Sequence, residues 1–253
     1  MKCTILQSAY LPWLGFFDFI DQSDYFIFLD DVQWTKRDWR SRNRCRTPQG
    51  WSWLTVPVNL KKSSREYKIC EVGISYSQPW IEKHLNLIYS CYKKTPFFPE
   101  VFPLIEKPLR EKHSNISNLN YALVLEIVNY LGIKDVVFKF SQKFKNVSHL
   151  EKSDKLIAIL KTLPKVKVYI SGVLAKNYID EDQFKEVGYS LLWHDYKHPY
   201  YNQKTWKQDV FISHLSIVDL LFNHGQESLD ILTGRMVIPK PKNVRILTPE
   251  DLK

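Results

Sequence analysis

Residues 25–29, YFIFL, followed by residues 30–46, DDVQWTKRDWRSRNRCR, are the stretch of this sequence that decides the fold. The first five residues form an apolar run as long as a buried strand. The next seventeen hold two leading carboxylates, two tryptophans and six Lys or Arg side chains. A buried strand that delivers charged groups at its carboxyl end is typical of an open α/β sheet, which binds ligands at that edge. The alternative is a solvated basic hairpin without a ligand.

The composition is that of a globular protein with an anionic partner. The chain has 253 residues, of which 44% are hydrophobic and 25% charged, and its formal net charge is +9. Nucleic acid, a nucleotide-linked metabolite, an acidic carrier protein and a membrane surface all fit that charge. We see no signal peptide and no apolar run of about 18 residues that could span a bilayer, and we expect a cytoplasmic protein. The four cysteines form no C-x-x-C pair, so we predict neither a zinc site nor a disulfide framework.

Hydrophobic periodicity predicts alternating strands and helices. We expect strands at residues 3–6, 25–29, 135–138, 166–170 and 190–193, and a hairpin over 42–58 with its turn at 47–50. Helical spacing marks residues 14–20, 81–92, 101–109, 119–131, 153–162 and 216–223. The sequence therefore predicts an α/β fold, with a mainly parallel, Rossmann-like sheet flanked by helices and a helical insertion at about 78–131. We assign residues 1–235 to this domain and residues 236–253 to an extended C-terminal tail.

Two N-terminal segments could hold an anion. Residues 7–15, QSAYLPWLG, place a polar loop and a glycine between a strand and a helix, although they form neither a P-loop nor a G-x-G-x-x-G motif. A buried aromatic turn explains this loop equally well. In the basic cluster, arginines suit bidentate phosphate or carboxylate contacts, and Asp30 with Asp31 could bind Mg²⁺. Pairing of one of these carboxylates with a neighbouring arginine is the simpler interpretation.

Three later segments also follow strands or begin helices. Ser171 and Gly172 end the strand VKVYI, where small residues permit close approach of a ligand, or a plain tight turn. Residues 194–203, HDYKHPYYNQ, contain His194 and His198, either of which could act as a general base or be an ordinary surface histidine. In residues 214–223, HLSIVDLLFN, Ser216 is an expected helix N-cap. Asp219 either supports that cap or enters a cleft and orients His214.

Taken together, these segments resemble the WbqC-like protein family of bacterial surface-polysaccharide clusters. The family opening Gln-Pro-x-(Tyr/Phe)-(Leu/Phe)-Pro-x-x-Gly-(Tyr/Phe)-Phe is matched at residues 7–17, with Ser8 in place of the usual proline. Its Ser-Asp-x-Phe, Asp-x-Val-Gln and Lys-x-x-Trp-x-x-Arg-Asn-Arg elements are matched at residues 23–26, 30–33 and 36–44. Its Tyr-(Leu/Ile)-Ser-Gly, Tyr-x-Gln and Leu-Ser-(Ile/Val)-x-Asp-Leu-Leu-Phe-Asn elements are matched at 169–172, 201–203 and 215–223. The resemblance covers residues 2–233.

The resemblance implies a transferase in surface-polysaccharide biosynthesis. We expect it to act on a nucleotide-linked sugar or an acyl thioester, and we favour transfer of an acyl or aminoacyl group to an amino sugar with formation of an amide. A glycosyltransferase that uses a nucleotide-sugar donor is the alternative among enzymes. A non-catalytic subunit and a nucleic-acid-binding protein are the alternatives outside them; the absence of an RNA-binding motif makes nucleic acid the weaker of these.

The predicted site combines proton-transfer and substrate-binding groups. The predicted catalytic residues are His198, His214 and Asp219. The predicted substrate-binding residues are Gln7, Asp31, Gln33, Lys36, Trp39, Arg42, Asn43, Arg44, Ser171, Gly172, Tyr201 and Gln203. No metal site is predicted, although Mg²⁺ could accompany a phosphate. The expected partners are an anionic small molecule, either a nucleotide-sugar or a coenzyme A thioester, and an acyl carrier protein as an alternative donor.

Overall fold

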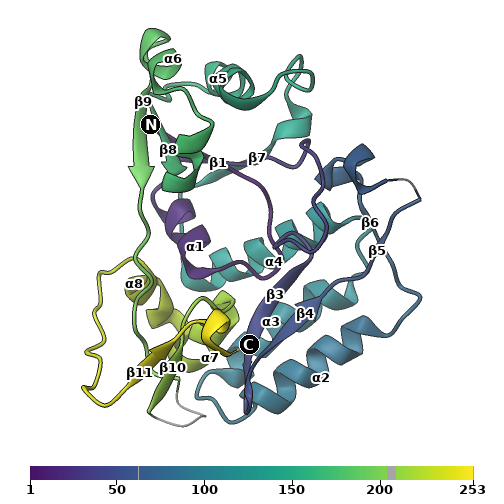
Figure 1. The fold of residues 1–253 in the computed structure, drawn as a ribbon, viewed down its shortest axis with the longest axis vertical. Coiled ribbons are helices and arrows are strands. Elements are labelled where there is room, and N and C mark those ends of the chain that lie inside the picture. Colours follow the sequence, from purple (N-terminus) through teal and green to yellow (C-terminus); the bar gives the residue numbers. More distant parts are fainter. Residues whose placement is uncertain (62, 204–208, 253) are drawn as a thin grey trace.

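A computed structural model describes residues 1–61, 63–203 and 209–252. Its centre is a five-stranded, fully parallel sheet. The strand order is β7 (Val137–Phe140), β2 (Tyr25–Phe28), β1 (Lys2–Leu6), β8 (Val168–Gly172) and β9 (Ser190–His194). The chain runs outward from β1 to β2 and β7, and then returns to the other side of β1 for β8 and β9 (Figure 1). The predicted α/β fold with a parallel, Rossmann-like sheet is confirmed.

The remaining elements surround this sheet or extend from it. The helices are α1 (Leu14–Asp21), α2 (Trp80–Tyr92), α3 (Phe98–Arg110), α4 (Ile116–Leu131), α5 (Lys152–Lys161), α6 (Glu181–Glu186), α7 (Ile217–His224) and α8 (Ser228–Leu232). Short strands pair as β3 (Arg42–Thr47) with β4 (Gly50–Thr55), β5 (Val58–Asn59) with β6 (Gly73–Ile74), and β10 (Val210–Ile212) with β11 (Arg245–Leu247). The 3₁₀ turns are Ser64–Glu66, Ile69–Glu71, Ser141–Lys143, Val173–Asn177, Gly225–Glu227 and Pro249–Leu252.

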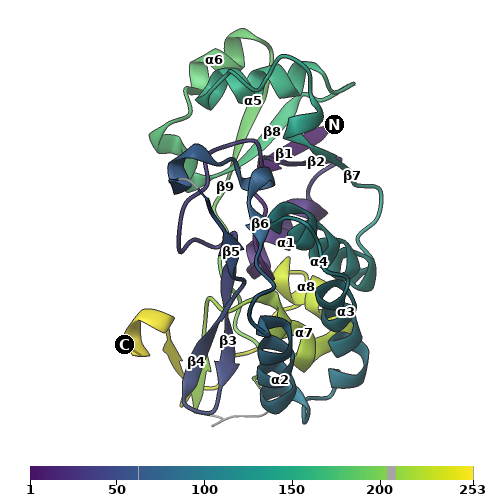
Figure 2. The same cartoon turned by 90° about the vertical axis from the view of Figure 1, so that its right-hand side faces the viewer.

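Alternation along β2 divides the interior into two apolar cores. Tyr25 and Ile27 face the core formed with α5 and α6, whereas Phe26 and Phe28 face the larger core on the opposite side. Successive side chains of a strand point to opposite faces, so an uninterrupted apolar run requires cover on both. Figure 2 shows this arrangement, with α5 and α6 over one face and α1 and α4 under the other. The run YFIFL is thus a central, doubly covered strand.

The predicted helical middle is present as α2, α3 and α4, inserted between β6 and β7. Helix α4 carries Tyr121 against Phe28, with ring centroids 5.5 Å apart, and therefore packs directly on the sheet. It ends at Gly132, whose φ of 71° is left-handed, as expected of a glycine that follows a helix. The insertion therefore supplies cover for the β2–β7 half of the sheet.

The C-terminal region contains a strand pair that periodicity did not predict. β10 and β11 are three residues each and pair in parallel, which brings the segment after residue 244 back onto the domain. Runs this short carry too few residues to show a period of two. Their pairing places the final turn, Pro249–Leu252, beside the β3–β4 hairpin.

The buried His84 should make folding stability depend on pH. Its Nδ1 lies 2.9 Å from the Tyr10 hydroxyl, and burial lowers the pKa of His84 from 6.5 to about 4. Between those values the unfolded chain binds the extra proton and the folded chain does not, so stability falls as pH falls from 6.5 to 4. The loss should reach about 3 kcal/mol.

Urea unfolding at pH 7 and pH 4.5 would measure this contribution. In His84→Gln the difference in unfolding free energy between the two pH values should shrink, because the substituted side chain cannot be protonated. His149→Gln, at an exposed histidine, is the matched control and should retain the wild-type difference. Equal pH dependence in His84→Gln and the control would contradict the assignment.

Candidate functional site

A cleft of about 720 Å³ opens at the carboxyl ends of β1, β8 and β9. Gln7, Gly172 and His194 line it at the ends of these three strands. Because β2 lies on one side of β1 and β8 on the other, the order in which strands are added to the sheet reverses beside β1. Crevices at such a switch point are the usual ligand sites of open α/β sheets. The position of the cleft therefore follows from the order of the strands.

The loop after β1 forms one wall and is held by hydrogen bonds from distant segments. The Asn43 side-chain amide donates to the carbonyls of Tyr10 and Leu11, at 3.2 and 2.7 Å. The Ser216 hydroxyl donates to the same Leu11 carbonyl at 2.7 Å. Leu11 has a φ of 43°, which L-residues adopt rarely, so these bonds stabilise a strained turn. The buried-aromatic-turn interpretation of this loop describes its structure correctly.

The glycine of this loop leaves room for a neighbouring indole. A Cβ on Gly15 would lie 2.0 Å from the Trp13 ring, which folds back over the start of α1. Trp13 itself is 38% exposed and faces the cleft. Gly15 thus permits an aromatic wall at this place.

The basic cluster forms a second wall, on the β3–β4 hairpin. Arg44 pairs across the hairpin with Trp53, and its guanidinium carbon lies 4.8–5.1 Å from the ring centroids of Trp39, Trp51 and Trp53. Its Nη2 donates to Glu250 at 2.9 Å. Arginine over an indole face is a favourable cation–π contact. Arg42 and Arg44 are therefore interleaved with tryptophans, whereas Lys36 and Arg37 are exposed.

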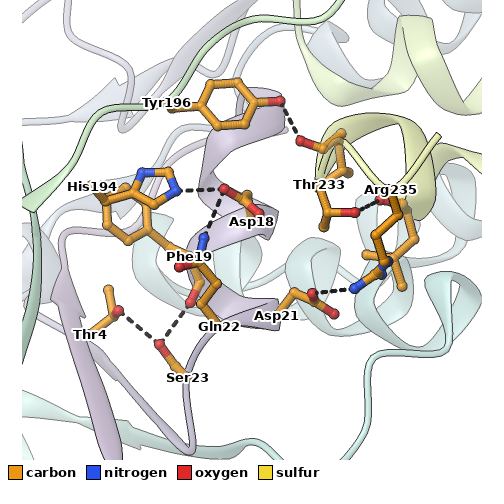
Figure 3. Close-up of polar contacts among 12 residues, drawn as sticks. Thr4, Asp18, Phe19, Asp21, Gln22, Ser23, His194, Tyr196, Thr233 and Arg235 are labelled. Atoms are coloured by element: carbon orange, nitrogen blue, oxygen red, sulfur yellow. Dashed lines mark hydrogen bonds and ion pairs between the residues drawn. The ribbon is translucent and has the colours of Figure 1, made fainter. Parts of the chain in front are cut away.

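A histidine–carboxylate pair connects His194 of β9, which lines the cleft, to the buried Asp18 of α1 behind it (Figure 3). His194 Nε2 is 2.5 Å from Asp18 Oδ2, which also accepts from the Gln22 amide at 3.0 Å. If Nε2 donates to the carboxylate oxygen, the lone pair of the imidazole tautomer is on Nδ1. Nδ1 is shielded from water and has no hydrogen-bond partner among the described residues. Phe19 and Tyr196 pack against the ring at centroid distances of 4.3 and 5.9 Å and fix its plane.

The two predicted catalytic histidines lie together in the same cleft. The His214 backbone N–H donates to His198 Nε2 at 3.2 Å, and His198 Nδ1 bonds the Pro199 carbonyl at 2.9 Å. Burial, with His214 nearby, lowers the pKa of His198 to about 4, so its ring is neutral. Both nitrogens of His198 are thus occupied by backbone groups. His214 is exposed, and its Nδ1 lies 2.7 Å from the Ser213 hydroxyl.

The structure brings seven of the predicted site residues together. These are Gln7, Trp39, Asn43, Arg44, Gly172, His198 and His214, all of which line the cleft. They come from six separate stretches of chain. The remaining predicted residues lie outside the lining.

Asp219, Tyr201 and Gln203 form a buried network away from the cleft. The Asp219 carboxylate is fully buried and accepts from Tyr92 at 2.9 Å, from Tyr201 at 2.8 Å and from Gln203 at 2.8 Å. Burial raises the pKa of Asp219, and these donors together with Arg46 oppose the rise. Ser216 caps α7 as predicted, by accepting from the Val218 N–H at 3.3 Å. Asp219 thus ties α7 to α2 and to the segment before β10.

The other predicted residues contact protein groups elsewhere. Asp31 is buried and forms an ion pair with Lys155 at 2.6 Å. Gln33 is exposed and donates to the Arg65 carbonyl, and Lys36 is exposed. Arg42 stacks on Trp53 at 4.0 Å from the ring centroid. Ser171 is buried within β8.

The described residues offer no group of three or more His, Cys, Asp or Glu side chains that could hold a metal ion. The Asp30 carboxylate accepts from the Ser8 N–H at 2.9 Å and from the Ser117 hydroxyl, and Asp31 pairs with Lys155. All four thiols are free, and burial raises the pKa of each, so none favours the nucleophilic thiolate.

Sequence reasoning missed Asp18 and Glu250. Asp18 lies in the helix LGFFDFID, where it is one of seven buried residues. A carboxylate on the apolar side of a helix requires a buried partner, and that signal was available. Glu250 gave no signal, because it reaches Arg44 through long-range packing that includes the β10–β11 pairing.

The fold and cleft define an α/β protein with an open cleft at the switch point of a parallel sheet, beside an aromatic and cationic hairpin. The WbqC-like protein family model matches residues 7–231, and the chain belongs to that family. A protein titled "Uncharacterized protein Rv1507c", from Mycobacterium tuberculosis strain H37Rv, is 38% identical over 235 residues, which cover 91% of this chain and 97% of that protein. No solved structure matches the chain. No helix in the described ranges is long and apolar enough to cross a membrane.

Asp219→Ala should destabilise the protein strongly. The substitution leaves Tyr92, Tyr201 and Gln203 without their common acceptor, and loss of a buried charged partner costs about 3–5 kcal/mol. Thermal and urea unfolding would measure the change. Asp182→Ala, an exposed carboxylate on α6, is the control and should change the unfolding free energy by less than about 0.5 kcal/mol. A stable Asp219→Ala protein would contradict this structural role.

Proposed function

We propose that this protein is a transferase that passes an acyl or aminoacyl group from an activated donor to the amine of an amino sugar in surface-polysaccharide biosynthesis. The His194–Asp18 pair carries the proposal, since it is a proton acceptor with its own orienting carboxylate in a cleft at the switch point. Asp18 bonds Nε2 and so directs the lone pair to Nδ1. This is the relation between base and orienting group found in many acyl-transfer sites.

The proposed step uses His194 as a general base. In this step substrate binding uncovers Nδ1, which is shielded in the free protein. Nδ1 then takes a proton from the attacking amine, whose nitrogen forms the C–N bond with the donor carbonyl. The C–S bond of a thioester breaks, and the proton passes to the departing thiolate. Asp18 stays ionised and stabilises the imidazolium that forms between the two transfers. His214, exposed in the same cleft, is the second proton acceptor within the site.

The walls of the cleft support a ligand with an anionic part and a less polar part. Arg44 offers guanidinium donors for a phosphate or carboxylate. Trp13, Trp39, Leu174 and Tyr178 are exposed by 38%, 42%, 82% and 56%, and all line the cleft. Exposed apolar side chains gathered around one opening are typical of a binding site. A nucleotide base or sugar ring, or the pantetheine arm of a coenzyme A or carrier-protein thioester, suits this rim.

A ligand panel would name the substrates. We expect a nucleotide-linked amino sugar, an acyl-coenzyme A or an acylated carrier protein to raise the melting temperature, because a ligand that binds the folded state stabilises it. Trp39→Ala should weaken the shift, since the indole forms part of the rim, while Trp193→Ala, outside the cleft lining, is the control. Stabilisation by non-amino nucleotide-sugars alone would favour glycosyl transfer. Stabilisation by single-stranded oligonucleotides alone would reject the transferase proposal.

Asp18→Asn should reduce turnover far more than substrate binding. The amide is nearly the same size, but it favours the wrong imidazole tautomer, and we expect kcat to fall by about 100-fold or more with KM changed less than threefold. Steady-state kinetics with the substrates found by the panel would measure both constants. Asp21→Asn is the control, because Asp21 lies on the same helix and bonds the partly exposed Arg235 at 2.9 Å. A loss of kcat equal in the two variants would contradict the proposal.

A further inference from the structure

The guanidinium of Arg44 is enclosed by aromatic rings at the edge of the cleft. Its side chain is only 10% exposed, and three indoles surround it. Nε is shielded from water and has no hydrogen-bond partner among the described residues. Aromatic faces attract a cation but accept no strong hydrogen bond from each of its N–H groups. A cation in such an enclosure requires an anion in contact with it.

In this structure that anion is the Glu250 carboxylate. Glu250 Oε1 lies 2.9 Å from Arg44 Nη2, although the Glu250 side chain is 56% exposed. It belongs to the turn Pro249–Leu252, which follows the three-residue strand β11. Glu250 also lines the cleft. A carboxylate from a short terminal segment thus reaches into the ligand site and contacts its enclosed arginine.

We propose that Arg44 is an anion-binding subsite of the cleft, and that Glu250 is its displaceable internal occupant. The ligand group would be a phosphate or carboxylate attached to a ring or planar unit that stacks on Trp39. On binding, this group takes the Arg44 contact, and the C-terminal turn leaves the cleft. The subsite is independent of the reaction proposed above, since it concerns which group binds and not what chemistry follows.

The energetics allow this exchange. An ion pair with one well-solvated partner contributes little, about 0–1 kcal/mol, and the β10–β11 pairing holds the segment that leads into the turn. A tethered group acts as a competitor at an effective concentration on the order of millimolar. A ligand with a doubly charged phosphate and a stacking ring adds contacts that Glu250 lacks. Glu250 therefore competes successfully with weak anions for Arg44, and a cognate ligand displaces it.

Binding of three probes to Glu250→Gln tests the proposal. The probes differ in the anion that they offer to Arg44. Uridine diphosphate carries a phosphate attached to a ring-bearing unit, inorganic pyrophosphate a phosphate without a ring, and succinate a carboxylate. Glu250→Gln keeps the side-chain shape but removes the competing charge, and we expect at least one probe to bind about 3–10 times more tightly than to the wild type by calorimetry. Glu82→Gln is the control, because it removes one negative charge from the exposed ion pair with Arg110 and should leave affinity unchanged.

Two further readouts identify the contact. Arg44→Gln added to Glu250→Gln should abolish the gain. In the wild type, amide hydrogen exchange over residues 245–252 should speed up when the probe is bound. Any of three results would overturn the proposal. These are equal affinity in Glu250→Gln and Glu82→Gln, weaker binding in Glu250→Gln, and no binding of any probe by Glu250→Gln. If the double variant does not fold, the comparison of the two single variants decides. Because none of the probes can undergo acyl transfer, tighter binding would establish the subsite whether or not the transferase proposal holds.

Discussion

The buried loop between β1 and α1 is the constraint on which the rest of the structure depends. Tyr10 and Leu11 are fully buried, yet their carbonyls are polar and must be hydrogen-bonded. Asn43 from β3 and Ser216 from the start of α7 provide those donors. The loop therefore holds the hairpin and the C-terminal helices against the sheet. Without it, the cleft would have one wall, formed by the strand ends alone.

This constraint explains why residues far apart in sequence meet in one cleft. Once Asn43 is fixed to the loop, its neighbour Arg44 must enter the cleft from the hairpin. Once Ser216 is fixed, His214, two residues earlier, lines the same cleft. Asp219 then secures α7 from behind, by accepting from Tyr92 on α2 and from Tyr201. The family motifs thus include two kinds of residue, those that line the cleft and those that hold its walls.

The sequence predicts the sheet well because doubly covered strands have a simple signature. The run YFIFL is apolar throughout, and the loop after β1 ends at a glycine before a helix. The site is predicted only in part, since a motif identifies residue types but not the direction of a side chain. Asn43 and Asp219 are both polar residues of the family motifs, but of the two only Asn43 lines the cleft. Asp18 and Glu250 depend on long-range packing, to β9 and through β10–β11, which local periodicity does not contain.

Two carboxylates outside the basic cluster determine what its cations and the nearby histidine can do. The charge of +9 alone suggests a cleft that attracts any anion. In the structure Arg44 is already paired with Glu250, and His194 is paired with Asp18. Each pairing lowers the attraction for a weak anion, because a ligand must replace a contact and not merely add one. Selectivity in this cleft therefore arises from exchange: a ligand must supply both a strong anion for Arg44 and a surface for the indoles around it.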